Sequence, residues 1–336
     1  MYEYDKLALI YDTKNSGVTY ITWIPGNTCT YACTYCHPSL HSGTIAWPSI
    51  DLAMSVFKNI TDHYKNKLGR QLFWIFLGGE SIIWKDFLKF LELAKEYDPS
   101  VYVHVVTNGK RTINWWNKAK HLIDQVSFTA HIEFVDLIEL REVINEVGDT
   151  IPQIGILVPV IPTKWNDCLE ALEILKEAEA YNFLRLKFLW ELDHYEGIEK
   201  FRQEHLGYKG IKYTEEQKEI INNLIYQKPN SKWPPYKWFS LLCTIKDDEV
   251  IQSYRGHQLI GLGANAWKGW KCYAGIESLS LDAEGNIKYS MCGAEGILGN
   301  WRTNPDSIQW PEDPIICPYE ICGCAADLII TKEKMQ

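Results

Sequence analysis

The amino-acid sequence predicts an α/β fold built on a parallel sheet, and two observations support this prediction. Short apolar runs alternate with amphipathic helical runs between Thr19 and Glu191. The apolar runs are continuous and rich in Val, Ile and Phe, which is typical of parallel strands buried on both faces. Six strand–helix units in series indicate either a doubly wound sheet or a partial barrel. In both architectures the reactive groups lie at the carboxyl ends of the strands.

Each unit carries a strand signal followed by a helix signal. The expected strands are the segments 18–24, 71–79, 101–109, 125–130, 153–160 and 183–191. The expected helices between them are the segments 49–67, 83–97, 112–123, 135–147 and 165–181. The strand segments are short apolar runs, whereas the helical segments are longer and have one apolar face. The third strand ends in Asn-Gly, a pair that favours a turn.

The pattern changes after Glu191. A charged helical segment at 214–227 leads into a connector rich in Pro and Trp, which predicts a domain boundary. Beyond it, residues 278–293 alternate between apolar and polar around a Glu-Gly-Asn turn, which predicts a β-hairpin. We therefore expect three parts: an N-terminal extension (1–17), a sheet domain with trailing helices (18–230), and a small Cys-rich module (231–336).

Composition narrows the class of protein. The chain has 336 residues, is 46% hydrophobic and carries a formal net charge of −9 without a basic block, so binding to nucleic acid is not favoured. The N-terminus lacks the apolar core of a signal peptide. No uncharged run reaches the ~18 residues of a membrane span. These features predict a soluble, cytoplasmic protein that does not bind membranes.

The ten cysteines lie in two separate zones. Three cluster near the N-terminus, Cys168 stands alone in an amphipathic helix, where we expect a core residue, and six follow from Cys243 onward. A chain of this size in a reducing compartment does not need a disulfide framework. Two thiol-rich zones therefore indicate two metal sites.

The first zone comprises Cys29, Cys33 and Cys36, in a loop that follows the first expected strand. The spacing, three residues and then two, lets three thiolates face one cubane, each on a different iron. A [4Fe–4S] cluster normally takes four protein thiolates, so this loop leaves one iron open. A zinc site completed by His37 is the alternative, because zinc accepts three thiolates and an imidazole.

At this point the sequence resembles the radical S-adenosylmethionine (SAM) superfamily, whose motif is Cys-x3-Cys-x-aromatic-Cys, with Tyr35 as the aromatic residue. The second strand ends in Gly78, Gly79 and Glu80, which match the Gly-Gly-Glu element that this family places on the SAM amino group. The third strand ends in Thr107 and Asn108, which can reach ribose hydroxyls. Ordinary strand-end turns are the alternative for either element alone.

The resemblance covers about residues 18–191 and implies a (β/α)6 partial TIM barrel. It also implies that the open iron chelates the amino and carboxyl groups of SAM. One electron then passes to the sulfonium, and the resulting 5′-deoxyadenosyl radical abstracts hydrogen from a substrate. An external electron donor of flavodoxin or ferredoxin type is the implied redox partner.

The second zone comprises Cys272, Cys292, Cys317, Cys322 and Cys324, with a possible sixth member at Cys243. It resembles the auxiliary-cluster module called twitch, a relative of the SPASM domain, with Gly285 in the hairpin turn. The resemblance implies one auxiliary [4Fe–4S] cluster with four ligands, so one of the five thiols is spare. Cys322 and Cys324 are a single residue apart, so we expect one of these two to be the spare thiol. A structural zinc site is the alternative. An auxiliary cluster either accepts an electron from a substrate radical or binds the substrate.

Four further residues are candidates. His131 and Glu133 follow the fourth strand and are suited to proton transfer or substrate contact, although a polar pair at a helix start is an equal alternative. Arg185 and Lys187 lie on one side of the last strand, where they reach the SAM carboxylate or remain edge charges.

The expected function is that of a radical SAM enzyme acting on a small molecule, such as a sugar, cyclitol or nucleotide, or on a peptide held directly by the barrel. The short N-terminal extension leaves no room for a peptide-recognition domain, which favours the small molecule. A ribosomal-peptide or RNA-modifying radical SAM enzyme is the alternative within the class. A structural zinc-binding protein is the alternative of another class.

Overall fold

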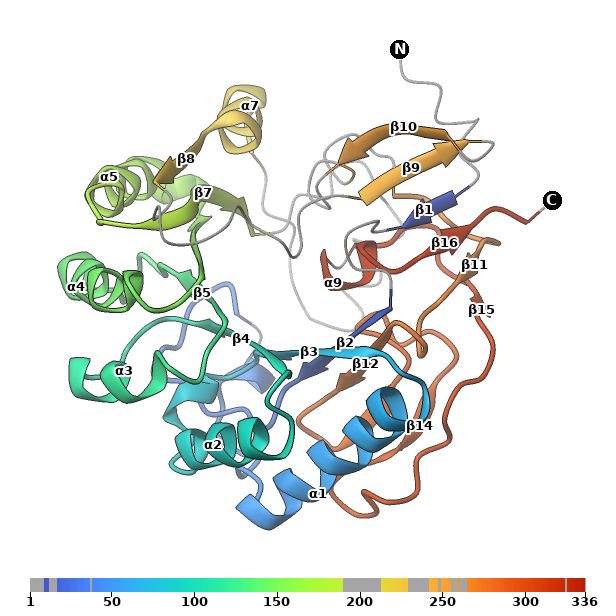
Figure 1. Cartoon of the computed structure of the whole chain (residues 1–336). Coiled ribbons are helices and arrows are strands. Elements are labelled where there is room, and N and C mark those ends of the chain that lie inside the picture. Colours follow the sequence, from blue (N-terminus) through green and yellow to red (C-terminus); the bar gives the residue numbers. More distant parts are fainter. Residues whose placement is uncertain are drawn as a thin grey trace.

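The structure is a computed structural model that describes residues 9–11, 17–36, 38–189, 213–228, 242–246, 249–254, 259, 265–323 and 325–335. Six parallel strands form the centre of its larger sheet (Figure 1). These are β2 (Val18–Trp23), β3 (Gln71–Phe76), β4 (Tyr102–Thr107), β5 (Gln125–Thr129), β6 (Gln153–Val160) and β7 (Tyr181–Phe188). Each pairs in parallel with the next along the chain. The predicted α/β fold with a mostly parallel sheet is confirmed, and it is consistent with a partial TIM barrel.

Helices cover the outer face of this sheet. They are α1 (Ile50–Thr61), α2 (Phe87–Tyr97), α3 (Ile113–Ala119), α4 (Leu137–Gly148), α5 (Trp165–Lys176) and, after β7, α7 (Glu215–Asn223). Side-chain oxygens of Ser49, Thr112, Asp136 and Thr214 cap the N-termini of α1, α3, α4 and α7, where backbone N–H groups lack helical partners. Within the described residues, no helix has both the length and the apolar character needed to cross a membrane.

The core between sheet and helices is strongly aromatic. Trp23 of β2 is fully buried and lies between 5.5 and 5.9 Å, centroid to centroid, from the rings of Trp74, Phe76, Phe90 and Trp301. Burial of each such ring contributes about 2–3 kcal/mol. Cys168 also lies in this core, fully buried on α5, as expected for an isolated cysteine.

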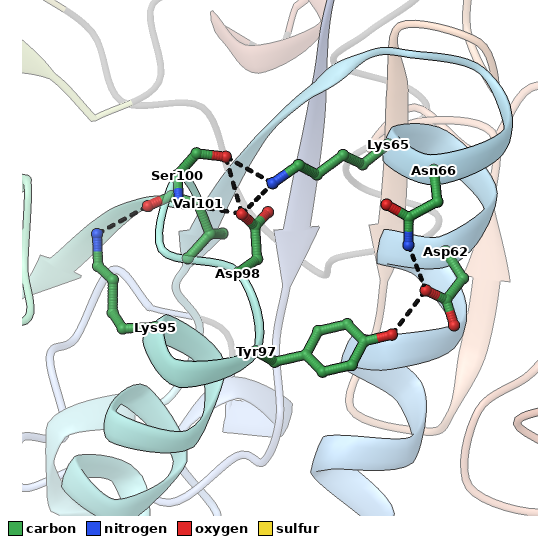
Figure 2. A network of polar contacts seen from close by, with 8 residues as sticks. All are labelled: Asp62, Lys65, Asn66, Lys95, Tyr97, Asp98, Ser100 and Val101. Carbon is green, nitrogen blue, oxygen red and sulfur yellow. Dashed lines mark hydrogen bonds and ion pairs between the residues drawn. The ribbon is translucent and has the colours of Figure 1, made fainter.

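A polar network fixes the amino ends of the strands (Figure 2). Lys65, in the π-helical turn η3 (Asp62–Lys67) that continues α1, pairs with Asp98 just after α2. Tyr97 donates to Asp62 across the same helix pair at 2.6 Å. Lys95 of α2 donates to the carbonyl of Val101 at 2.7 Å, directly before β4. These contacts join the ends of α1 and α2 to the start of β4, opposite the edge where the strands end.

The predicted C-terminal hairpin is present, and it extends the barrel sheet. Strand β12 (Ser278–Leu281) pairs in parallel with β2, and β13 (Asn286–Lys288) returns antiparallel to β12. Gly285 in the turn has φ +104°, a conformation that favours glycine. Strand β14 (Ile297–Asn300) completes this edge, and β8 (Ile225–Lys228) pairs antiparallel with β7 at the other.

A second sheet combines the two ends of the chain. Its order is β10 (Glu249–Tyr254), β9 (Leu242–Lys246), β1 (Leu9–Tyr11), β16 (Lys332–Glu333), β11 (Lys271–Cys272) and β15 (Ile315–Ile316). A short helix, α9 (Ala325–Leu328), precedes β16. The N-terminal segment thus contributes a strand to the Cys-rich region. Three residues are too few to show a period, and their partners lie more than two hundred residues away, so the sequence gives no sign of this pairing.

Candidate functional site

The first three cysteines lie on the loop between β2 and α1, at the carboxyl end of the barrel strands. Cys33 is buried, whereas Cys29 and Cys36 are half-buried, and the N–H of Cys36 donates to the carbonyl of Cys33 at 3.0 Å. Burial, followed by the influence of the other two thiols, raises the pKa of Cys33 to about 12. Burial and Cys29 raise the pKa of Cys36 to about 11. With raised pKa values, these thiols stay protonated when no metal is bound. Iron stabilises the thiolate form, so the three cysteines are suited to an iron–sulfur cluster.

The loop is held in shape by Asn27, which the sequence did not single out. Its side chain is buried, and its Nδ2 donates to the carbonyl of Ser39 at 2.8 Å and to the hydroxyl of Ser42 at 2.9 Å. Its Oδ1 accepts from the N–H of Ile45 at 2.8 Å. The amide therefore closes the loop by joining residues on both sides of the three cysteines.

The Gly-Gly-Glu element lies directly against this loop. Gly79 has φ +52°, and a Cβ there would lie 2.6 Å from the carbonyl oxygen of Thr28. A Cβ at Gly78 would clash with the side chain of Ile24 at 2.4 Å. The N–H of Glu80 donates to the same Thr28 carbonyl at 2.8 Å. Both glycines are therefore required for the close approach of the β3 end to the cysteine loop.

Glu80 is buried at the centre of the strand-end residues. Its carboxylate accepts from the hydroxyl of Thr107 and from the N–H of Asn108, each at 2.7 Å. Burial raises the pKa of Glu80 to about 7, although these two hydrogen bonds oppose the shift. The Asn108 amide in turn donates to the hydroxyl of Thr30 on the cysteine loop at 2.9 Å. The structure thus brings the three predicted motifs into direct contact.

His131 and Glu133 also contact the cysteine loop. The hydroxyl of Tyr35 lies 2.5 Å from Nδ1 of His131, and the two rings are stacked. The carboxylate of Glu133 accepts from the N–H of Thr34 at 2.9 Å and from its hydroxyl at 2.7 Å. Burial, assisted by the charge of Lys187, lowers the pKa of His131 to about 4, so the imidazole is neutral. Both residues support the loop from the end of β5.

Lys187 and Arg185 lie on β7. Lys187 is exposed, and its positive charge contributes to the lowered pKa of His131. The guanidinium of Arg185 lies 5.8 Å from the centroid of the Phe183 ring.

The second cysteine group comes from separate segments. Cys272 of β11, Cys292 after β13 and Cys317 after β15 belong to one small cluster of apolar side chains, which includes Ala274 and Ile330. Cys322 packs in a neighbouring cluster, and its backbone is paired twice with Asn265, at 2.9 and 2.8 Å. The side chains of His37, Cys243 and Cys324 lie outside the described residues.

Two buried charges back this group, and the sequence did not point to either. The carboxylate of Asp327 accepts from the N–H of Cys292 at 2.8 Å and from that of Met291 at 3.2 Å. The ammonium of Lys332 donates to the carbonyls of Asp327 and Ile330, at 2.6 and 2.9 Å. Burial, and then the carboxylate of Asp327, raises the pKa of Cys292 to about 12. The role of Asp327 depends on contacts with Met291 and Cys292, which lie about 35 residues away in the sequence. No local sequence pattern could therefore have indicated it.

The described cysteines of the two groups are not arranged around a single ion. Across the part of the chain that the structure describes, no group of three or more His, Cys, Asp or Glu side chains has the arrangement of a mononuclear metal site. An iron–sulfur cubane differs in this respect, because it receives each thiolate on a separate iron. The three thiol donors of Cys29, Cys33 and Cys36 are chemically suited to such a cubane.

Comparisons with known proteins agree with the geometry. Residues 23–179 match the model of the Radical SAM superfamily. The fold resembles that of anSMEcpe with bound AdoMet and Cp18Cys peptide, at 13% identity and a TM-score of 0.51, over 87% of this chain and 82% of that one. It also resembles Streptococcus suis SuiB bound to precursor peptide SuiA, at 12% identity and a TM-score of 0.53, over 88% and 65%. No curated protein sequence matches the chain.

The matched region runs from the end of β2 to the residues before β7 and makes up slightly less than half of the chain. At these identities the two solved structures establish likeness of fold alone. The family match over this region supports a radical SAM enzyme, a class that uses S-adenosylmethionine and a [4Fe–4S] cluster.

Proposed function

We propose that Cys29, Cys33 and Cys36 hold a [4Fe–4S] cluster at which SAM is cleaved reductively. The contact of Glu80, Thr107 and Asn108 with the cysteine loop is the observation that carries this proposal, because it joins the three motifs at one strand edge. When bound, the cluster and SAM supply a 5′-deoxyadenosyl radical that abstracts hydrogen from the substrate.

The protein's own groups position the cofactor. Three thiols leave one iron without a protein ligand. The carboxylate of Glu80 supplies a charged acceptor for the amino group of SAM, and Thr107 and Asn108 orient it. Asn108 is also a candidate for the ribose, Tyr35 borders the cofactor within the loop, and Lys187 is a candidate for the SAM carboxylate. The neutral imidazole of His131 and the carboxylate of Glu133 stay available for proton transfer or substrate contact.

An auxiliary [4Fe–4S] cluster in a twitch- or SPASM-like module is the second part of the proposal. The shared surroundings of Cys272, Cys292 and Cys317 support three of its ligands, and Cys322 or Cys324 would supply the fourth. A cluster there would accept an electron from the substrate radical, giving a net oxidation, or bind the substrate.

The substrate is a small molecule or a peptide in this proposal. Two proteins of similar fold were solved with bound peptides, and this supports a peptide as a candidate substrate in addition to a small molecule. A flavodoxin- or ferredoxin-type donor would supply the electron. None of the eight cysteines that the structure describes forms a disulfide with another of them, which suits a reducing compartment such as the cytoplasm.

Anaerobic reconstitution tests the proposal. Reduced protein given SAM should form 5′-deoxyadenosine, and the yield should rise when extract of the native host supplies the substrate. About eight iron atoms per chain would indicate two cubanes. Zinc without iron in protein purified free of oxygen would instead support the structural zinc protein and refute the enzyme.

A further inference from the structure

The cysteine loop is closed at its base, where its two sides come together. Thr28 and Ser42 form an antiparallel backbone bridge between the sides. The side chain of Asn27 adds hydrogen bonds across the same base. We call residues 25–28 and 42–46 the neck of the loop, because the three cysteines lie between these two segments.

A side chain from the C-terminal part of the chain reaches this neck. Arg302 follows β14, and its Nη2 donates to the carbonyl of Pro25 at 2.8 Å and to the carbonyl of Ala46 at 2.9 Å. Pro25 comes directly after β2, and Ala46 lies just before α1, so one guanidinium nitrogen joins the two sides of the neck. Arg302 is 277 and 256 residues away from these carbonyls in the sequence.

The guanidinium of Arg302 is fixed from its own side of the contact. Its Nε donates to the carbonyl of Ala283 at 2.6 Å, in the turn after β12. Its Cζ lies 4.2 Å from the centroid of the Trp301 ring, which is fully buried in the barrel core. The backbone N–H of Arg302 also donates to Oδ1 of Asn300 at 3.0 Å. The planar group is therefore held in place where it meets the neck, and it serves carbonyls from three segments at once.

Other contacts already attach this part of the chain to the barrel. Strand β12 pairs with β2, and the buried ring of Trp301 packs against Trp23. Asn59 of α1 donates to the carbonyl of Pro305 at 2.7 Å. The two hydrogen bonds from Arg302 to the neck are additional to this attachment, and they act on the cysteine loop itself.

We propose that Arg302 is a positioning residue for the barrel cluster, which holds the neck closed and so fixes the three cysteines relative to the end of β3. This inference rests on the proposed function. The carbonyl of Thr28, in the neck, accepts from the N–H of Glu80 at 2.8 Å. The position of the neck therefore also sets how the cysteine loop meets the residues proposed to bind SAM.

Hydrogen–deuterium exchange of the reconstituted protein, followed by mass spectrometry, tests the proposal. The N–H groups of Gly43 and Ile45 donate across the neck to Asn27, at 3.1 and 2.8 Å, so their exchange reports how often the neck opens. In Arg302→Gln, peptides that cover the neck should exchange about tenfold faster, because two hydrogen bonds between its sides are lost. Peptides from β12 and β13 should exchange at the wild-type rate.

Two further variants make the test specific. Arg302→Lys should give an intermediate rate, since an ammonium is a compact donor that cannot reproduce the planar fork, and it also covers the case in which Arg302→Gln does not fold. Asn59→Ala is the matched control, because it breaks a contact of the same C-terminal segment with α1 and leaves the neck untouched. Exchange in the neck should be unchanged in this control.

The electron paramagnetic resonance signal of the reduced barrel cluster gives a second readout. The SAM concentration that converts half of this signal should rise about fivefold in Arg302→Gln and stay unchanged in Asn59→Ala. Unchanged exchange of the neck or an unchanged SAM dependence in Arg302→Gln would overturn the proposal. Equal acceleration in β12 and β13, or in Asn59→Ala, would also overturn it, because Arg302 would then only attach the C-terminal segment. Wild-type protein without iron would refute the proposed function instead, while the exchange rates still decide the role of Arg302.

Discussion

The two cysteine groups of this chain are built in opposite ways. Cys29, Cys33 and Cys36 come from one short loop at the carboxyl edge of the barrel, in which Thr30, Ala32 and Thr34 are exposed. Cys272, Cys292 and Cys317 come from three segments of the Cys-rich region and meet among apolar side chains. Each group contains one buried and two half-buried thiols, so the two groups differ in where their cysteines come from in the chain and not in burial.

The two groups also differ in the charged residues that border them. The first lies against Glu80, whose carboxylate accepts from the Thr107 hydroxyl and the Asn108 N–H and is suited to an ammonium. The second is backed by Asp327 and Lys332, a negative and a positive charge that are both buried. We expect this difference to distinguish a SAM-binding site in the barrel from a second cluster site in the Cys-rich region.

The largest expected effect separates the two groups directly. Cys33→Ala should abolish 5′-deoxyadenosine formation and remove about four iron atoms per chain, because a cubane does not persist on two thiolates. Iron analysis and product chromatography measure both. Cys168→Ala is the control, since Cys168 is buried in a helix away from either group. Unchanged SAM cleavage in Cys33→Ala would contradict the account.

Cys292→Ala should have the opposite pattern. It should also lose about four iron atoms per chain but still cleave SAM, because the barrel site stays intact. Substrate conversion should be lost. Parallel assays of 5′-deoxyadenosine and substrate turnover measure this. Retention of all iron in the variant would remove Cys292 from the ligands and would argue against the auxiliary cluster.

Glu80→Gln tests the open side of the barrel group. Loss of a charged hydrogen bond costs about 1.5–3 kcal/mol, so SAM should bind roughly 10- to 100-fold more weakly. In the wild type, the pKa of Glu80 is raised to about 7 by burial, so the carboxyl is neutral below that pH. The Kd for SAM should therefore fall as the pH rises from about 6 to about 8. Calorimetric titration over this range measures both effects, and equal pH profiles for wild type and variant would contradict the assignment.

The smallest expected effect concerns the support of the cysteine loop. Glu133→Gln weakens two hydrogen bonds to Thr34, at a cost of about 1 kcal/mol, so a chelator should remove the barrel cluster about fivefold faster. Iron release into bipyridine measures this, and the auxiliary iron should leave at the wild-type rate. Glu142→Gln, on the exposed face of α4, is the control. Equal release from the two variants would leave Glu133 without a supporting role.

The sequence predicted the barrel well because its signals are local. Six continuous apolar runs each became a parallel strand, since burial on both faces requires uninterrupted apolar sequence. The three strand-end motifs were also found, because parallel strands bring their carboxyl ends to one edge. The contacts confirm that Glu80 and Asn108 lie against the cysteine loop.

What the sequence did not predict depends on distant pairing. The hairpin was expected in a separate module, but β12 joins β2 in the barrel sheet. The strand β1 was missed because its partners, β9 and β16, are near the other end of the chain. The same reason hid Asn27 and Asp327, whose roles come from backbone groups that they reach only in the folded chain.

One measurement tests the central claim most directly, namely that the barrel group leaves an iron free for SAM. Reduced, reconstituted protein is examined by electron paramagnetic resonance before and after SAM is added, with Cys33→Ala and Cys292→Ala alongside. SAM should change the signal that survives in Cys292→Ala and leave the signal in Cys33→Ala unchanged. A cluster signal in Cys292→Ala that is indifferent to SAM would contradict the account.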